Sequence, residues 1–466
     1  MSGRRLMEVR IMAASFSTIT RRQVLAATVG AASALTLAAC GAVPAAPPAE
    51  APETEEKAAA PPETEVREIT VSNYHSPEDP RWTAISETYR IGEEALGIKI
   101  NTTPEYREVN TKRATEWAAG TTTVDITYNQ LNWFLPWGLS GMLVDLNPYF
   151  AKGPREKADY FTTDLEAWGW GGKLYALTFQ FGGECFMFNR QLFDNAGLNY
   201  PTKDWTYDDM LEMGRKLTNP DEKRYAVRVA QNHIFYMHGT YVLNFGGPLL
   251  DEKKEKALFG EDPGAIAGTQ YNVDLHLKHQ FTPPAELREQ LPQGQNYLEA
   301  GFVAMENNGI FRHNTIRKFL GENLDFAPPP KGVNQRAAVL GNAHSILSLS
   351  EVQDLAWDLL MWLHSEQGFL ETPQFGAIAW PPVITYAKHP KWLEPFEGTR
   401  VLDAVDVWES GGHTSGVLPE RGEVLQVARA EMGRMINGET TVPEGLRTMA
   451  DQMNSILAQR PPEWRQ

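Results

Sequence analysis

The sequence predicts an α/β fold built as two lobes. Short apolar runs alternate with amphipathic stretches of helical period from residue 68 onwards, and this alternation is typical of βαβ units. The patterned part spans about 400 residues, more than one hydrophobic core usually supports. The chain also holds 13 Trp, 15 Tyr and 20 Phe, so it has ample apolar surface to bury.

The predicted elements follow one another along the chain. Each strand is a short apolar run, and each helix has apolar residues at helical spacing. The helix that ends at Leu217 has Thr206 as its predicted N-cap. Strands are expected at 68–71, 98–100, 124–128, 303–305 and 346–349, and helices at 81–96, 205–217 and 353–364.

The first 39 residues read as an export signal. Paired arginines at 21–22 precede a short apolar run at 26–39, and small residues lead to Cys40. This pattern has a twin-arginine character and ends in a lipobox. A buried helix or a membrane span is the alternative, but the run is short and only its N-terminal flank is charged. We therefore expect removal of 1–39 and acylation of Cys40, which anchors the protein outside the cytoplasm, at the cell surface or in the periplasm.

A tether follows the lipidated cysteine. Residues 42–65 are almost entirely Ala, Pro, Glu and Thr, a composition that cannot bury enough surface to fold. Residues 40–65 are thus predicted to be a disordered link between the anchor and the folded body.

Charge and cysteine content exclude several classes of protein. The formal net charge is −16, and nucleic-acid binding requires clustered Lys and Arg. Besides Cys40 the chain holds only Cys185, so no disulfide within the chain is possible once Cys40 is acylated. Cys185 lies in an apolar strand-like run, which favours an inert buried thiol.

Motifs for common enzymes are missing from the sequence. It has no G-x-S-x-G, P-loop, G-x-G-x-x-G or HExxH motif. His276 and His279 are spaced i, i+3, and a solvated helix face explains them better than zinc does. A glycosidase would need two carboxylates that face each other at a fixed separation. We predict no catalytic residue, metal or cofactor.

Several segments resemble the signature of family 1 extracellular solute-binding proteins, the sugar-binding lipoproteins of ABC importers that include maltose-binding protein. They occur in the family's order and together span about 66–457. The segments are GKLYAL at 172–177, FNRQLFDNAGL at 188–198, WTYDDM at 205–210, LEAGFVAM at 298–305, FAPPPKG at 326–332, VLGN at 339–342, FGAI at 375–378 with prolines at 381–382, and a helical tail at 424–457.

The resemblance implies the type II periplasmic binding protein fold. Two Rossmann-like lobes are joined by a hinge, with the ligand in the cleft between them. The chain would cross the hinge near 177–182 and again near 339–344. The first lobe is then 66–178 plus 340–410, and the second is 179–339 plus 411–460.

The resemblance also implies ligand-binding residues. Asn132 and Trp133 stand where relatives place a polar group and an aromatic against the sugar, with Asn in place of the usual Asp. Tyr236 matches a stacking tyrosine, and Phe311 stands where a Trp is usual. Core packing is the alternative for each aromatic. The further candidates are Asn73, His75, Gly182, Glu184, Asn342, His344 and Trp380, of which Trp380 would lie at the cleft mouth.

The function expected from the resemblance is capture of a mono- or oligosaccharide by hinge closure and delivery to a membrane permease. The protein would act as a monomer, with its carbohydrate ligand, the ABC importer and the membrane as partners. A secreted carbohydrate-active enzyme remains an alternative, and for it the resemblance offers Glu184 and Glu306 as the only carboxylates in the cleft. A receptor for a non-sugar solute is a further alternative. The mapped cleft residues include no Arg or Lys cluster, which argues against an anionic ligand.

Overall fold

The computed structural model describes residues 67–105, 109–229, 234–373, 380–414 and 416–466. They belong to one compact unit, Val66–Gln466. The expected export signal, the acylation of Cys40, the tether and the FGAI motif at 375–378 lie outside the described residues. No helix in the described ranges is long and apolar enough to cross a membrane.

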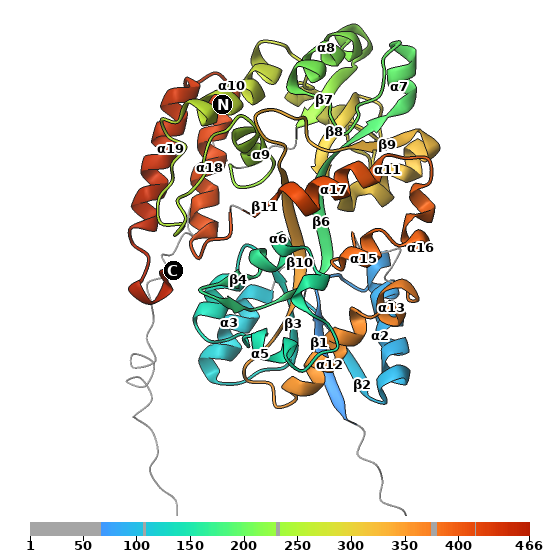
Figure 1. Ribbon diagram of the computed structural model, residues 1–466, viewed down its shortest axis with the longest axis vertical. Helices are drawn as coiled ribbons and strands as arrows, with labels where there is room; N and C mark the ends of the chain where they lie inside the picture. Colours follow the sequence, from blue (N-terminus) through green and yellow to red (C-terminus); the bar gives the residue numbers. More distant parts are fainter. Residues whose placement is uncertain (1–66, 106–108, 230–233, 374–379, 415) are drawn as a thin grey trace, which may run out of the picture. The chain divides into compact units, whose positions relative to one another are not determined.

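In the described part of the chain, nine strands form one mixed sheet (Figure 1). The strand order is β2-β1-β3-β10-β6-β8-β7, with β9 beside β6 and β11 beside β10. The strands are β1 (Glu68–Asn73), β2 (Lys99–Pro104), β3 (Ile126–Gln130), β6 (Leu177–Asn189), β7 (Tyr225–Val229), β8 (Val303–Gly309), β9 (Leu324–Ala327), β10 (Ala337–Ile346) and β11 (Gly412–His413); β4 (Gly169–Trp170) and β5 (Lys173–Leu174) pair separately.

Strands β6 and β10 connect the two ends of the sheet. The first half of β6, up to Gly183, pairs with β10 in antiparallel register. The second half, from Glu184, pairs with β8 and β9. On its other side β10 pairs with β3, which leads to the parallel strands β1 and β2. The two predicted hinge crossings therefore lie on neighbouring strands that run through the middle of the molecule (Figure 1).

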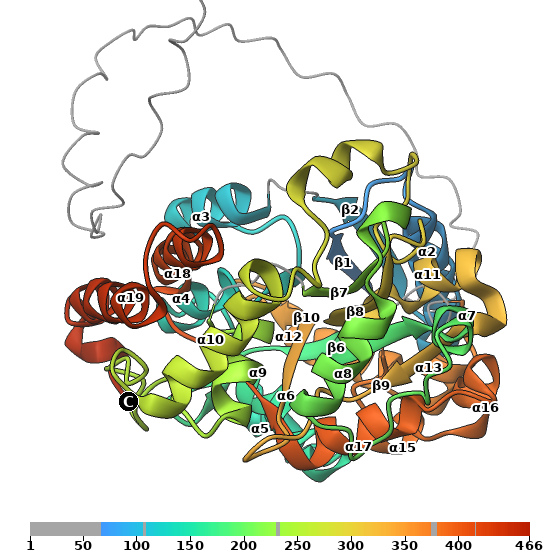
Figure 2. The ribbon, with the colours of Figure 1, turned by 90° about the horizontal axis from the view of Figure 1, so that it is seen from above.

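Helices surround this sheet (Figures 1 and 2). Local chemistry sets several starts: the Asp79 side chain accepts from the backbone N–H of Arg81, and Thr206 and Asp209 cap each other reciprocally. The helices are α2 (Pro80–Leu96), α3 (Val109–Ala119), α4 (Phe134–Leu139), α5 (Asn147–Phe150), α6 (Thr162–Ala167), α7 (Arg190–Asn195), α8 (Tyr207–Leu217), α9 (Met237–Asn244), α10 (Pro263–Leu277), α11 (His313–Leu320), α12 (Gln353–Leu363), α13 (Glu366–Leu370), α15 (Ile384–Ala387), α16 (Pro390–Leu393), α17 (Val401–Gly411), α18 (Arg421–Ile436) and α19 (Val442–Leu457).

Most of the elements predicted from the sequence are confirmed, with three adjustments. The strand expected at 124–128 begins at Ile126. The strand expected at 346–349 is wrong, because β10 ends at Ile346 and is followed by an isolated bridge between Leu347 and Leu143 and then a turn. The helical tail is two helices, since Gly438 adopts a left-handed φ of 72° and Thr441 caps α19. The two helices pack side by side (Figures 1 and 2).

The core confirms the expectation for Cys185 and also contains two tryptophans. Cys185 is free and buried, and burial raises the pKa of its thiol. Trp168 and Trp170 are core residues, with exposed fractions of 0% and 4%. The Trp168 indole donates to Thr178 Oγ1 at 2.6 Å, which satisfies its polar group inside the core.

Candidate functional site

The ends of β1 and β3 carry the first group of predicted ligand residues. Asn73 ends β1, and its side-chain oxygen accepts from the backbone N–H of His75 at 3.0 Å. Both side chains are buried. Burial lowers the pKa of His75 to about 4, so this side chain is neutral at pH 7. It can take part in hydrogen bonding without bringing a charge.

Aromatic stacking surrounds His344 on β10. Its ring lies 4.1 Å from the Phe179 ring at 10°, and Phe179 contacts Tyr128 edge-on at 5.8 Å. Tyr128 in turn stacks on Tyr74 at 4.6 Å. Burial lowers the pKa of His344 to about 3. His344 is thus a neutral packing residue between β6 and β10.

The paired middles of β6 and β10 present amide groups. Asn342 is half-buried, and its Nδ2 donates to Gln180 Oε1 at 2.7 Å. Asn342 also faces Gln130 in the ladder between β10 and β3. Gly182 pairs with residue 340 through its backbone and has no side chain to offer a ligand. Asn342, Gln180 and Gln130 therefore form a polar, uncharged strip across three strands.

Tyr236 and Phe311 meet at Gly309. A Cβ added to Gly309 would clash with the Phe311 ring and lie 3.0 Å from Tyr236 Oη. Only glycine fits between the two aromatic residues. Tyr236 is buried and immediately precedes α9, whereas half of the Phe311 surface is exposed. An exposed ring and a buried hydroxyl are thus adjacent, although 75 positions separate them in the sequence.

The loop after β3 carries Asn132 and Trp133. Asn132 is exposed, and its Oδ1 accepts a hydrogen bond from Arg421 Nε at 3.2 Å. Trp133 is half-buried against the largest core cluster. Its indole Nε1 is buried and has no hydrogen-bond partner in the described ranges. The core residues Trp362 and Trp380 share this feature in the described part of the chain, so Trp133 stays a candidate through its position in the loop after β3.

Arg421 is a residue at this location that the sequence reasoning missed. It is the first residue of α18, is 4% exposed and donates to the carbonyl of Gly416 as well as to Asn132. A Cβ on Gly416 would clash with Phe235, the neighbour of Tyr236. Burial, with a contribution from Arg429, lowers the pKa of Arg421 to about 10. No motif marks Arg421, because its partner Asn132 is 289 positions away.

Glu184 faces protein groups and not a ligand. It is fully buried, and its carboxylate accepts from Thr240 Oγ1, from the Ala338 N–H at 2.8 Å and from Asn307 Nδ2 at 2.9 Å. Burial raises the pKa of Glu184 to about 7 despite these donors. This corrects the expectation of a ligand contact. Through these hydrogen bonds Glu184 connects β6 to α9, β10 and β8. Tyr236 immediately precedes α9, and β8 leads to Phe311.

Glu184 and Glu306 cannot act as a glycosidase pair in this geometry. On the paired strands β6 and β8, Glu184 lies opposite Gly309 and Met187 lies opposite Glu306. Because alternate residues of a strand point to opposite faces of the sheet, the two carboxylates are on opposite faces. They cannot flank one glycosidic bond as that mechanism requires.

Trp380 is a core residue, which corrects its assignment to the cleft mouth. It is fully buried, and its ring contacts Trp392 at 5.4 Å, Phe396 at 5.2 Å and Trp408 at 5.5 Å. Its backbone exchanges two hydrogen bonds with Phe181 on β6. Three parts of the chain that are distant in the sequence cover Trp380, so no local sequence pattern predicts this packing.

The two histidines at 276 and 279 take part in local structure. His276 Nδ1 lies 2.9 Å from Thr282 Oγ1, and the His279 ring stacks on Phe281 at 5.2 Å. In the described ranges, no group of three or more His, Cys, Asp and Glu side chains is arranged to hold a metal ion.

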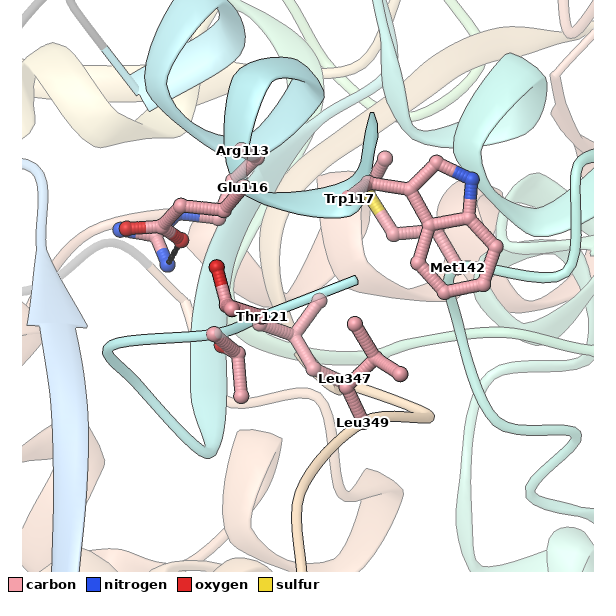
Figure 3. A pocket seen from close by; sticks show the side chains of 8 residues that line it. Arg113, Glu116, Trp117, Thr121, Met142, Leu347 and Leu349 are labelled. Carbon is pink, nitrogen blue, oxygen red and sulfur yellow. Dashed lines mark hydrogen bonds and ion pairs between the residues drawn. The ribbon is translucent and has the colours of Figure 1, made fainter. Parts of the chain in front are cut away.

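Two hollows lie away from the candidate residues. The first, beside α3, is lined by Arg113, Trp117, Met142 and Leu347 among others (Figure 3). Its volume of about 10 Å³ leaves room for about one water molecule. The second is an open depression of about 420 Å³ at the start of α12. Neither is lined by a predicted ligand residue, so the chemistry of the side chains identifies the candidate site.

Comparison with known proteins supplies the context for these residues. Residues 81–368 match the family model of bacterial extracellular solute-binding proteins. A binding protein of Brucella abortus (strain 2308) is 21% identical over 307 residues, which cover 64% of this chain and 72% of that protein.

Solved structures show the same fold. The sugar-binding protein MalE from Xanthomonas citri superposes with a TM-score of 0.73 at 17% identity, covering 84% of this chain and 98% of that one. An ABC substrate-binding protein of Listeria monocytogenes, in complex with cycloalternan, has a TM-score of 0.70 at 20% identity, with coverage of 85% and 100%. The cyclic alpha-maltosyl-1,6-maltose binding protein of Arthrobacter globiformis gives the same TM-score, identity and coverage. The two-lobed α/β architecture of this group is the fold that the sequence predicted.

Proposed function

Because this chain belongs to the bacterial extracellular solute-binding proteins, we propose that it captures a carbohydrate outside the cytoplasm and delivers it to the permease of an ABC importer. Solved proteins of the same fold bind oligosaccharides such as cycloalternan. Members of the family bind solutes, and the opposed orientation of Glu184 and Glu306 disfavours glycoside hydrolysis.

The observation that carries the proposal is the meeting of Tyr236 and Phe311 at Gly309. A sugar presents a C–H face that packs on an aromatic ring and hydroxyl groups that need fixed hydrogen-bond partners. Phe311 offers the ring and Tyr236 a hydroxyl beside it. Asn132, Trp133 and Asn342 offer further polar groups, and with Tyr236 and Phe311 they form the proposed ligand site.

Capture by hinge closure is part of the proposal. The lobes would be 66–178 plus 340–410 and 179–339 plus 411–460, with the hinge on β6 and β10. Asn132 and Arg421 fall in different lobes under these boundaries, yet they are hydrogen bonded. This contact is of the kind that closes a cleft.

Attachment to the membrane completes the proposal. The acylated Cys40 would hold the protein at the membrane, and residues 40–65 would allow the folded body to reach the permease. Mass spectrometry of the mature protein tests this: a lipid on Cys40 is expected, and Cys40→Ala should carry none. An unmodified Cys40 on the mature wild type contradicts the anchor.

The proposed function is tested by a thermal-shift screen with mono- and oligosaccharides, followed by small-angle scattering. A ligand at 100 times its Kd stabilises the state that binds it by about 2.7 kcal/mol. We expect a rise in Tm with at least one saccharide, together with a smaller radius of gyration. Failure of every saccharide to bind, or release of products from an oligosaccharide, would overturn the proposal.

A further inference from the structure

We propose that the captured ligand is an acidic carbohydrate, whose carboxylate is bound by Arg421. This inference rests on the proposed carbohydrate function and narrows it to uronate-containing saccharides. It reverses the expectation from the sequence that the site holds no cation for an anionic ligand.

Arg421 is a buried cation without a counter-ion. Its guanidinium donates to two neutral oxygens, Asn132 Oδ1 and the Gly416 carbonyl, and it forms no ion pair in the described ranges. Buried charges in proteins are normally paired, because an unpaired one loses its hydration without compensation. Nη2 of Arg421 forms no hydrogen bond with any described residue, so it remains available as a donor.

The carboxylates nearest in the sequence are engaged elsewhere or exposed. Glu420 accepts two hydrogen bonds from Arg460, at 2.8 and 2.9 Å, in a bidentate pair. Glu423 is exposed on α18. Arg429, on the same helix, raises the positive potential at Arg421 further, since it contributes to the lowered pKa of Arg421. The positive charge at Arg421 is therefore not neutralised by the carboxylates nearest to it in the sequence.

Arg421 lies between residues proposed to bind the ligand. It contacts Asn132 on one side, and on the other Gly416 packs against Phe235, next to Tyr236. The remaining members of the proposed ligand site, Trp133, Phe311 and Asn342, carry no charge. Glu184, the nearby acid, is held by three protein donors. The site thus has one formal positive charge, which a single carboxylate would match.

The chain as a whole favours this assignment. Its net charge of −16 repels anions at long range, so an anionic ligand needs a local cation to be bound. A neutral sugar accepts hydrogen bonds from a buried guanidinium but leaves its positive charge unmatched. The planar fork of Arg suits a carboxylate geometrically.

The experiment measures binding of uronate oligosaccharides and of the same oligosaccharides after reduction of each carboxyl to a hydroxymethyl group. Calorimetry with the wild type should show that at least one uronate binds about tenfold or more tightly than its reduced form. Its affinity should fall with added NaCl, while that of the reduced form should not. Arg421→Gln should abolish the difference, and Arg421→Lys should keep part of it.

A matched control is Arg447→Gln, which removes an exposed arginine paired with Glu261 and should keep the preference. Melting curves check that each variant folds, and the salt dependence of the wild type tests the proposal without any variant. Equal or better binding of the reduced sugars overturns this inference and leaves carbohydrate capture standing. Retention of the uronate preference in Arg421→Gln also overturns it. Failure of every saccharide, acidic or neutral, overturns the proposed function as well.

Discussion

Two regions of the molecule hold arginine in opposite ways. In the first, which we call the paired cluster, Arg228 and Arg312 meet Glu306 and Glu299: Arg228 Nη1 lies 2.7 Å from Glu306 Oε1, and Arg312 binds Glu299. In the second, Arg421 meets only the oxygens of Asn132 and Gly416. The paired cluster satisfies its charges within the chain. The positive charge of Arg421 has no carboxylate partner among the described residues, so we expect a ligand to provide one.

The difference between the two regions separates charges that stabilise the fold from a charge that is available to bind a ligand. In the paired cluster the carboxylates are buried and the arginines are half-buried, so loss of an arginine strands a buried negative charge, and this is costly. At Arg421 no carboxylate would be stranded by such a change. The paired cluster should therefore matter for stability and Arg421 for binding, and the predictions below test that division.

Acidification should have the largest effect, and it acts on both regions alike. Burial lowers the pKa of His238, His344, His364 and His413 to about 3, and that of His75, His276 and His313 to about 4. Below pH 6.5 the unfolded chain takes up protons that the folded chain cannot, so stability falls as the pH falls. Each histidine contributes up to about 1.4 kcal/mol per pH unit.

Two carboxyls oppose this trend. Burial raises the pKa of Asp164 and Glu184 to about 7, so between about pH 4 and 7 they favour the folded state at the acidic end. Seven histidines outweigh two carboxyls, and the free energy of unfolding should be several kcal/mol lower at pH 5 than at pH 7. Urea denaturation at both values measures it. Equal or greater stability at pH 5 would contradict the burial of these histidines.

Glu306→Gln should have the next largest effect, through the paired cluster. It leaves the half-buried Arg228 and Arg312 without the buried carboxylate between them, and loss of these charged contacts should lower the free energy of unfolding by about 2 kcal/mol. The control Glu261→Gln removes an exposed partner of Arg447 and should change it by less than about 0.5 kcal/mol. A loss below 1 kcal/mol in Glu306→Gln would show that the cluster is not the stabilising region.

Phe311→Ala tests the ligand site next to the paired cluster. Phe311 precedes Arg312 of that cluster in the chain, but its ring lies at Gly309 beside Tyr236. Loss of an exposed ring that stacks on a sugar should weaken ligand binding by about 1 kcal/mol, roughly fivefold, with stability unchanged. Phe319→Ala is the matched control, since it removes an equally exposed phenylalanine, 46% against 50%, from α11. Equal affinities in the two variants would remove Phe311 from the site.

Arg421→Gln should have the smallest effect on the ligand-free protein. With no carboxylate left behind, the free energy of unfolding should change by about 1 kcal/mol or less. Urea denaturation beside Glu306→Gln compares the two regions directly. If both variants lose the same stability, Arg421 is structural and the contrast between the regions fails.

Local features of the sequence were sufficient to predict the elements and the fold class. The helix from Pro80 is set by its Asp79 cap, and the one from Tyr207 by the reciprocal caps of Thr206 and Asp209. Strand β1 is an alternating apolar run. These features depend on residues within a few positions of each other, which is why they can be read without a structure.

The predicted ligand residues fall into two groups in the structure, some in the proposed ligand site and some in the core. Tyr236, Phe311 and Trp380 were all predicted to contact the ligand. The structure places Tyr236 and Phe311 beside Gly309, whereas Trp380 is enclosed by Trp392 and Trp408. Aromatic residues have the same composition signal in a core and in a ligand site. Which of the two they occupy depends on the segments that cover them, and those segments are distant in the chain.

Sequence by itself determined the periodicity, the caps, the acidic balance and the family signature of this protein, because each is carried by neighbouring residues or by composition. Only the tertiary structure decided that Glu184 points to one face of the sheet and Glu306 to the other, and that Arg421 reaches Asn132 across 289 positions without meeting a carboxylate. The physical reason is that burial and charge pairing belong to the three-dimensional neighbourhood of a side chain. That neighbourhood is assembled when β6 and β10 pair and bring distant segments together.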